Sequence, residues 1–468
     1  MVRLMDKKVC IVGGGLGGLA TGSLLVRKGY TVEIFEKEKI LGGRALTFNG
    51  NKLTLDEYQN ILHRFDMWLP FAEPDIETIF ERNMLHGYRF DLGFHLLGFA
   101  SKSPITRILN AQNEPVNILS TRFGVIHPTE GVKSSLRNYL SNKDKAKLLP
   151  LAIRVLTARK TTIKDLQTIS LQETIDKYCK GKIRDVVGIA GKLIATSNNL
   201  EKISTGESIR ILEHWIKGAR KGGNYPIGGS SSLSLAFSNT IRKNGGKIHL
   251  NNKVNRILIK DYKAKGIEIK GEKKHYDAVV SNLPVQDLFR IAPAQWFPNE
   301  YVKKIKSLEG TGSVCAYYAM KRIPAKYVDK PFAFVEQDLN IEGKDAAGVI
   351  DFITANPRSG LSPKNSHLVQ AYIICSPKEA VNRKKVRILR EVLDKKMEVL
   401  IPNFRNKLIF SLYPTSWHLD GVAKTIDNEK PKSTTPIKNL YLVGDCIKST
   451  GIGMNCAVES AADLAFNF

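Results

Sequence analysis

The sequence predicts an α/β protein in which a parallel sheet, assembled from distant segments, carries an inserted α+β domain. Three observations predict this class. A buried strand, a glycine turn and a helix follow one another over residues 8–20, a second strand covers 31–35, and a strand at 439–443 ends in another glycine-rich turn. Strands that alternate with helices are typical of a sheet covered on both faces. A chain of 468 residues is long enough for about two or three domains.

The first glycine turn has the spacing of a phosphate-binding loop. Gly13, Gly15 and Gly18 occupy the glycine positions of G-x-G-x-x-G. In such a turn the first glycine permits the tight bend, the second lets a pyrophosphate approach the backbone, and the third packs the helix against the strand. Leu16 and Gly17 open the helix, whose N-terminal N–H groups and dipole attract phosphate. The alternative is a purely structural βαβ unit, which the following residues disfavour.

The second strand ends at Glu36, 18 residues after the third glycine of the turn, and Lys37 follows it. An acidic side chain at this position accepts hydrogen bonds from a ribose hydroxyl. The sequence GGR at 42–44 then brings Gly43, where a ligand can approach the backbone, and Arg44, a fixed cation for a pyrophosphate. Together these signals predict that the sheet binds a dinucleotide.

These elements resemble the flavin-dependent amine oxidase and phytoene desaturase superfamily, whose FAD domain opens with G-x-G-x-x-G, an acidic residue and a GGR turn. FDLGFH at 90–95, YPIGG at 225–229 and DAVVSN at 277–282 are closest to the phytoene (carotenoid) desaturase-like branch. The resemblance covers nearly the whole chain. It implies a Rossmann-like FAD-binding domain of the glutathione-reductase type, an inserted α+β substrate domain, and FAD as the cofactor.

The resemblance also assigns residues to parts of the cofactor. It places the backbone of Val254, in a predicted strand over 251–257, against the adenine ring. Gly444 and Asp445 end the last strand, where the carboxylate would accept hydrogen bonds from the ribityl chain. Gly453 and Met454 begin the final helix, whose N-terminus would stabilise negative charge on the flavin pyrimidine.

Two residues of the FDLGFH segment carry separate predictions. His95 is in the right neighbourhood for contact with the flavin ring or for proton transfer, so it is the candidate catalytic residue. The alternative for His95 is a packing or hydrogen-bonding role. For Asp91 the sequence favours a structural role, as the cap of a turn.

The predicted FAD domain comprises 1–100, 222–290 and 405–468, and the substrate domain comprises 101–221, which is helical, and 291–404. In the second insertion, apolar and alternating runs predict an antiparallel sheet. These runs cover 314–320, 332–335, 348–353 and 367–375. A large sheet covered by helices would make the floor of a long apolar cavity.

The resemblance implies hydride transfer between flavin N5 and an apolar, isoprenoid- or carotenoid-like substrate, as desaturation or the reverse saturation. A redox-neutral isomerase is compatible with the same scaffold, and the electron acceptor stays open among oxygen, a quinone and a nicotinamide. Carotene desaturases commonly place proline near the last glycine turn, whereas this chain has Met454, Asn455 and Cys456. This departure leaves carotenoid specificity open.

Two alternatives compete with a desaturase. Amine and porphyrinogen oxidases share the fold, and Trp417 could be one of the two aromatic rings that amine oxidases place beside the flavin. Val422 and Ala423 supply no second ring, and a packing role for Trp417 is favoured. Non-catalytic proteins that bind prenylated partners also share the fold, but their flavin sites are degraded, whereas the residues described above are all present.

Composition limits the partners. The chain carries 71 Lys and Arg against 45 Asp and Glu, a net charge of +26, but the basic residues are scattered, and no zinc spacing or stacking-aromatic motif points to nucleic acid. Apolar and basic residues mix in a helical stretch at 143–164, which predicts docking to an anionic membrane surface or an ordinary surface helix. Six cysteines without a C-x-x-C pair, no signal peptide and no long apolar run predict a cytoplasmic protein, at most peripherally bound to a membrane.

Overall fold

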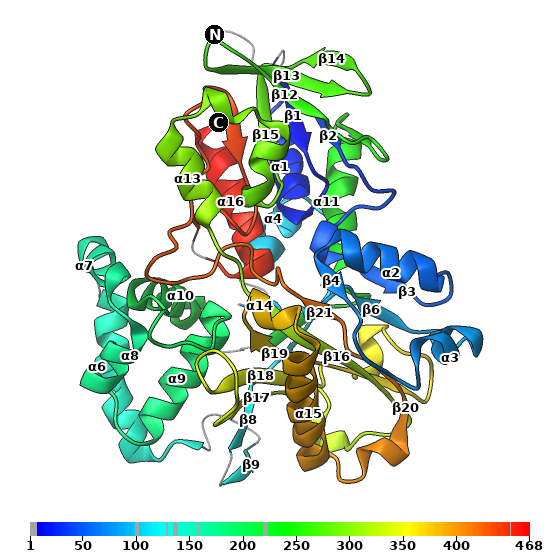
Figure 1. Ribbon diagram of the computed structural model, residues 1–468, viewed down its shortest axis with the longest axis vertical. Coiled ribbons are helices and arrows are strands. Elements are labelled where there is room, and N and C mark those ends of the chain that lie inside the picture. The colour runs from blue at the N-terminus through cyan, green and yellow to red at the C-terminus, as the bar shows by residue number, and fades with distance from the viewer. Residues whose placement is uncertain are drawn as a thin grey trace.

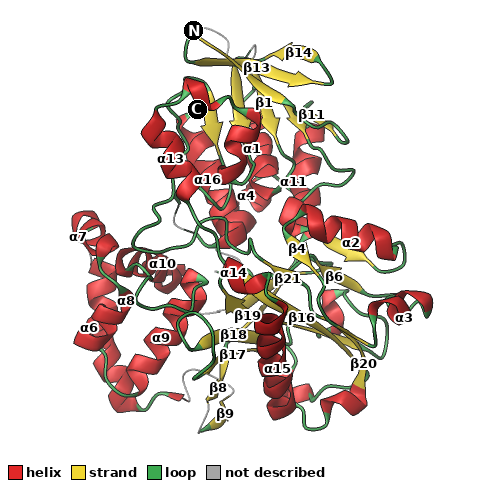
Figure 2. Cartoon of the chain, in the orientation of Figure 1, coloured by secondary structure: helices red, strands yellow, loops and turns green. Residues whose placement is uncertain are grey.

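A computed structural model describes residues 7–98, 103–127, 130–133, 139–157, 159–218, 223–449 and 451–468. It has three parts, which Figure 1 shows as a parallel-sheet domain at the top, a larger sheet at the lower right and a lobe of helices at the lower left. Figure 2 shows the same division by secondary structure, with strands gathered in the first two parts and helices in the third.

The upper sheet is parallel throughout, in the order β11-β2-β1-β15-β22. Its strands are β1 (Lys8–Val12), β2 (Thr31–Phe35), β11 (Lys247–His249), β15 (Ala278–Ser281) and β22 (Leu440–Leu442). Successive residues of β1, Val9, Cys10 and Ile11, have no exposed surface, because both faces of the sheet are covered. This arrangement confirms the α/β class that the alternation of strands and helices predicts.

Different elements cover the two faces. Helices α1 (Leu16–Arg27), α11 (Ser231–Lys243) and α16 (Gly453–Asn467) share one core with the sheet. A three-stranded meander covers the other face, together with α12 (Leu288–Ile291) and α13 (Asn299–Ser307). The meander consists of β12 (Arg256–Lys260), β13 (Lys263–Ile269) and β14 (Glu272–His275).

The lower sheet has ten strands, whose main path runs β4-β21-β16-β19-β18-β17-β8-β9, with β20 and β5 attached beside β16. The four strands predicted for the second insertion form its centre and pair in antiparallel fashion. They are β16 (Gly312–Met320), β17 (Pro331–Glu336), β18 (Ala346–Asp351) and β19 (His367–Cys375). The other members are β4 (Met67–Trp68), β5 (Ala72–Glu73), β8 (Gly124–His127), β9 (Gly131–Lys133), β20 (Leu408–Leu412) and β21 (Thr415–Ser416).

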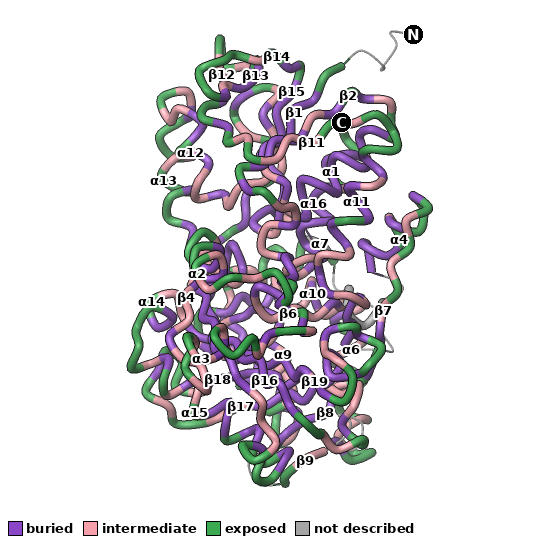
Figure 3. The backbone as a smooth tube through the Cα atoms, turned by 90° about the vertical axis from the view of Figure 1, so that its right-hand side faces the viewer, coloured by how far each residue is buried: buried purple, intermediate pink, exposed green. Residues whose placement is uncertain are grey.

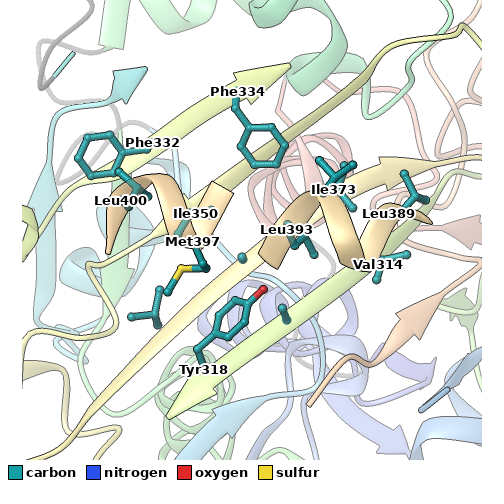
Figure 4. Packing of buried hydrophobic residues seen from close by; sticks show 14 of the residues in the cluster. Val314, Tyr318, Phe332, Phe334, Ile350, Ile373, Leu389, Leu393, Met397 and Leu400 are labelled. Atoms are coloured by element: carbon teal, nitrogen blue, oxygen red, sulfur yellow. The ribbon is translucent and has the colours of Figure 1, made fainter. Parts of the chain in front are cut away.

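Helix α15 (Arg383–Leu400) covers one face of the lower sheet, as Figure 4 shows. Its apolar residues Leu389, Leu393, Met397 and Leu400 recur at helical spacing and face Ile350 and Ile373 of the sheet, among others. Because side chains alternate along a strand, the neighbours Val349 and Tyr372 point to the opposite face. That second face is therefore available to line a cavity.

The lobe of helices comprises α6 (Asn142–Thr157), α7 (Lys160–Asp165), α8 (Leu171–Tyr178), α9 (Lys182–Ala195) and α10 (Thr205–Gly218). The Ser170 side chain caps α8 by accepting a hydrogen bond from the backbone N–H of Glu173. The described part of 101–221 is not only helical, however, since it also contains β7 (Ile118–Thr121), β8 and β9. These short strands lack a clear alternation, and β7 and β8 become stable through pairing with the distant strands β10 (Gly223–Pro226) and β17.

Several predicted boundaries differ from the observed packing. Residues 67–73 and 408–416, assigned from the sequence to the FAD domain, supply four strands of the lower sheet. Helix α13 packs against the core of the upper domain through Ile305, although the sequence assigns 291–404 to the substrate domain. Val254 lies in an extended connection just before β12 and not within a strand. Figure 3 shows buried segments in both the upper and the lower part of the molecule, with exposed segments toward the outside.

Smaller elements join the two sheets. Strand β3 (Thr47–Asn49) pairs with β6 (Arg89–Asp91), and β7 pairs with β10 (Gly223–Pro226). The short helices are α2 (Leu55–Arg64), α3 (Ile76–Glu81), α4 (Pro104–Ala111) and α14 (Pro377–Ala380). Among the described residues, no helix has both the length and the apolar composition that crossing a bilayer requires.

Candidate cofactor and substrate site

A cavity of about 830 Å³ lies where the carboxyl ends of the parallel strands face the lower sheet. The structure brings thirteen of the fourteen predicted cofactor residues, together with His95, to the wall of this cavity. The thirteen are Gly13, Gly15, Leu16, Gly17, Glu36, Lys37, Gly43, Arg44, Val254, Gly444, Asp445, Gly453 and Met454. The residue that does not line the cavity is Gly18.

The glycine turn has the geometry that its spacing predicts. Gly13 adopts φ 101°, a left-handed conformation that favours glycine. A Cβ on Gly18 would lie 2.2 Å from the carbonyl oxygen of Gly13, so Gly18 serves close packing of α1 against the turn. Gly15 is the N-cap of α1 and makes no side-chain cap, which leaves the helix N-terminus to a ligand.

Glu36 is held in place at the end of β2. Its Oε2 accepts a hydrogen bond from the Gly14 N–H at 2.6 Å and its Oε1 accepts one from the Glu38 N–H at 2.9 Å. Burial raises the pKa of Glu36, and the two backbone donors oppose this shift. The carboxylate therefore joins the glycine turn to the β2 end of the cavity, close to the backbone that follows β11.

Arg44 and Asp445, 401 residues apart in the chain, meet at the opposite end of the cavity with Nη2 and Oδ1 2.6 Å apart. Arg44 Nη1 also donates to the carbonyl of His418 at 2.9 Å, and Asp445 Oδ2 accepts from the Gly421 N–H at 2.9 Å. Burial opposes charge on Asp445, but Arg44 and Lys430, with the Gly421 N–H, together outweigh it and hold the pKa of this carboxyl well below its usual range. Both side chains are thus charged at neutral pH.

Asp91 has a larger structural role than the predicted turn cap. Its fully buried carboxylate accepts hydrogen bonds from Thr47 Oγ1 at 2.5 Å, Tyr225 OH at 2.7 Å, and the N–H and Oγ of Ser230 at 3.1 and 2.7 Å. Burial opposes charge on Asp91, but its hydrogen bonds and the adjacent His95 lower the pKa of the carboxyl. Asp91 therefore ties β6 to β3, to β10 and to the start of α11.

His95 lies on the cavity wall just beyond this hub. Its Nδ1 is 3.5 Å from Asp91 Oδ2, and its backbone carbonyl accepts a hydrogen bond from Gln370 Nε2 at 2.9 Å. The second contact fixes the segment to β19. The structure thus places an imidazole beside a buried carboxylate at the cavity, and its catalytic role stays a prediction.

Asn282 and His418 are among the cavity residues that the sequence analysis did not single out. Asn282 follows β15, and its side chain lies 2.7 Å from a Cβ built on Gly15 and 2.6 Å from one built on Gly17. Its position directly after a parallel strand could have marked Asn282 as a candidate binding residue. His418 stands in an irregular segment with no such signal, and burial together with Arg44 lowers the pKa of its imidazole. The neighbouring Trp417 packs against the core of the lower sheet and does not line the cavity.

Past His95 the cavity continues as an apolar compartment between the free face of the lower sheet and α9. It is lined by Phe94, Phe123, Val125, Leu193, Val349 and Tyr372, among others. Phe94 stacks on Tyr372 with their ring centroids 4.2 Å apart. The lower sheet therefore forms the floor of an apolar space that opens directly into the glycine-lined part.

The glycine turn at a helix N-terminus, the acidic residue after the second strand and the second glycine turn after the last strand define a dinucleotide-binding protein of the two-domain flavoprotein class. Residues 16–465 match the family described as flavin-containing amine oxidoreductases. The chain therefore belongs to this family of FAD-dependent oxidoreductases, and its cofactor is FAD. The residues present fit that group, because glycines line the cavity wall at both turns, where the backbone is open to a ligand, and the N-terminus of α1 is left uncapped.

Among relatives, an uncharacterized protein of Methanocaldococcus jannaschii is 28% identical over 59% of this chain and 58% of its own length. A 4,4'-diapophytoene desaturase of a Methylomonas species is 27% identical over 59% of this chain and 53% of its own. The alignments thus span a little over half of each relative. A solved oxidoreductase from Methanosarcina mazei superposes with a TM-score of 0.74 at 21% identity, covering 98% of this chain and 99% of that one, which shows the shared fold.

Proposed function

We propose that this protein transfers hydride between FAD and a long apolar substrate of the isoprenoid or carotenoid-like class, as a desaturase or in the reverse, saturating direction. The observation that carries the proposal is the apolar compartment that opens into the cofactor cavity beside His95. The desaturase relative from Methylomonas supports the same substrate class. FAD supplies the hydride-accepting or hydride-donating centre when it is bound.

The protein's own residues would bind and orient the substrate and would accept or donate the proton. The stacked Phe94 and Tyr372 give an extended hydrocarbon a flat apolar wall and exclude water. Desaturation removes a hydride from one carbon and a proton from the next, so a base is needed at the border of the two compartments. His95 is the imidazole at that border, and Asp91, 3.5 Å from its Nδ1, would favour the tautomer that is protonated on that atom.

The alternative functions receive less support from the site. Trp417 lies away from the cavity wall, so it does not supply the aromatic ring that an amine oxidase would place there. A non-catalytic lipid-binding role would not need the pairing of Arg44 with Asp445 or the uncapped N-terminus of α1. Oxygen, a quinone and a nicotinamide remain the proposed classes of electron acceptor.

Anaerobic reduction of the bound flavin tests the proposed substrate class. We expect the purified protein to be yellow. If it is a desaturase, an acyclic isoprenoid delivered in detergent should bleach the flavin absorbance. If it works in the saturating direction, a more unsaturated polyene should restore the absorbance of flavin that has first been reduced chemically. Diamines and porphyrinogens are expected to leave the absorbance unchanged. Bleaching by a diamine but by no isoprenoid would replace the proposal with amine oxidation.

We further propose that α6 and α7 dock on an anionic membrane surface. Leu149 and Ile153 stand one turn apart on α6 with 61% and 51% of their surfaces exposed, and the exposed Lys143, Lys147 and Arg154 lie on the same helix. Helix α6 packs on α9 and α10, which contribute to the wall of the apolar compartment. An apolar substrate could thus pass from the bilayer into the protein with little exposure to water.

Replacement of both Leu149 and Ile153 by serine is expected to weaken binding to phosphatidylglycerol vesicles about a hundredfold, since burying two such side chains is worth about 3 kcal/mol. Flotation on a density gradient measures the bound fraction. Leu235→Ser is the matched control, because Leu235 is 60% exposed but belongs to α11 of the upper domain. Equal flotation of the double variant and the wild type would contradict docking through α6.

A further inference from the structure

Five charged side chains of alternating sign form a row that begins at the cavity wall, where the partly exposed Arg44 and Asp445 meet, and continues into buried positions. The row runs Arg44, Asp445, Lys430, Asp420 and Lys424. Lys430 Nζ donates to the carbonyl oxygen of Asp445 at 2.5 Å and lies 3.9 Å from Asp420 Oδ1, while Lys424 pairs with Asp420 Oδ2. Three cations face two carboxylates, so the row itself carries one positive charge in excess.

The position of Lys430 is unfavourable for a positive charge for two reasons. Its side chain is only 6% exposed, so it has lost most of its hydration. It also lies at the wrong end of a helix, because its Nζ is 3.5 Å from Cys456 Sγ in the first turns of α16. Cations are normally favoured at helix C-termini, where the dipole is negative. Burial opposes charge on Lys430, but its neighbours Cys456, Asp420 and Asp445 together raise its pKa.

The order of the strands shows which part of the cofactor this charge would meet. Glu36 and Val254 lie beside β2 and β11 at one edge of the upper sheet, and Asp445 follows β22 at the opposite edge. If Glu36 and Val254 bind the adenosine half of FAD at the β11 edge, as predicted, the flavin ring extends to the β22 edge of the sheet. The apolar compartment, where hydride exchange with a substrate would occur, opens off this same cavity. Lys430 is therefore beneath the ring end of the site, behind Asp445 and the N-terminus of α16.

We propose that Lys430 tunes the reduction potential of the flavin, by adding a buried positive charge to the dipole of α16 and so favouring the more negative, reduced state of the ring. The inference rests on the proposed redox function of this site. Lys430 touches neither the cavity nor the reacting atoms, so it acts through Asp445 and the local field and is a positioning residue. A buried charge acts at longer range than a surface charge, because the protein screens it less.

The test is the midpoint potential of the bound flavin, measured by reductive titration against a reference dye without substrate. Lys430→Met keeps the length of the side chain and removes its charge. We expect this variant to bind flavin and to favour the oxidised form about tenfold more than the wild type does, which for two electrons is a potential about 30 mV lower. Lys430→Arg keeps the charge and is expected to stay within threefold of the wild type.

Asp420→Asn provides a control of opposite sign. It keeps the shape of the side chain but removes a negative charge from the row, so its potential is expected to rise. General loosening of the site would shift Lys430→Met and Asp420→Asn in the same direction, and that result would overturn the proposal. Lys448→Met, which removes a partly exposed lysine paired with Glu429, is expected to leave the potential unchanged.

The outcomes separate this inference from the proposed function. An unchanged potential in Lys430→Met overturns the inference but not the hydride transfer. Opposite shifts in a protein that reacts with no isoprenoid support the inference and contradict the substrate class. If Lys430→Met does not fold, a rise in Asp420→Asn with a wild-type value in Lys430→Arg supports the proposal, and a fall or no change in Asp420→Asn overturns it.

Discussion

Gly18→Ala is expected to yield a protein with little or no bound flavin. The added Cβ would lie 2.2 Å from the carbonyl oxygen of Gly13, and this atom belongs to the turn that bends beneath the pyrophosphate site. Backbone cannot move aside as a side chain can, so α1 must shift away from β1. Overpacking of this kind costs about 1–3 kcal/mol, which predicts an affinity for FAD that is weaker by roughly 5- to 150-fold. The flavin-to-protein absorbance ratio after gel filtration measures the loss.

Gly22→Ala is the matched control for that prediction. It makes the same substitution one turn further along α1, where the new Cβ meets the terminal methyl groups of Ile34 and Ile241 at 2.9 and 3.2 Å. Those flexible ends can give way, and alanine favours a helix over glycine by about 1 kcal/mol. We expect Gly22→Ala to retain its flavin. Equal losses in both variants would show that α1 tolerates no added volume and that the Gly18 contact is not special.

The parts of the site that follow from local geometry could be predicted from the sequence. A turn that needs the left-handed conformation of Gly13 and the close packing of Gly18 accepts few residues other than glycine, so the motif is visible in the chain. The acid at Glu36 is equally visible, because parallel strands present their last residues at the same edge of the sheet. These short-range requirements explain why the cofactor residues could be named one by one.

The contacts that depend on distant pairing could not be predicted. Strand β4 and its partner β21 have two residues each, too few for any alternation, and they form only because β16 provides a neighbour. His418 reaches the cavity through an irregular segment whose direction is set by hydrogen bonds to Arg44 and Asp445. The role of Asp91 likewise comes from donors on three separate elements, and a sequence shows none of them together.

Asp91→Ala is expected to lower the free energy of unfolding by about 3–5 kcal/mol, a large part of the stability of an ordinary domain. Without the carboxylate, the hydroxyl groups of Thr47, Tyr225 and Ser230 lose their common acceptor in a fully buried place. Asp91→Asn retains one acceptor oxygen and is expected to lose less. Urea unfolding followed by circular dichroism measures the difference, and a loss below about 1 kcal/mol in Asp91→Ala would contradict the role of Asp91 as a hub.

The pH dependence of these variants separates the charge of Asp91 from its shape. The folded protein lowers the pKa of Asp91, whereas the unfolded chain has a value of about 3.9. The charged form thus adds stability that is fully present above about pH 5 and is lost as the pH falls through the lower, folded value. The gap in unfolding free energy between wild type and Asp91→Asn should therefore be widest near neutral pH and narrow in acid. A gap that stays constant from neutral pH to about pH 3 would contradict this expectation. It would mean that the charge of Asp91 adds no stability and that its hydrogen-bond geometry alone matters.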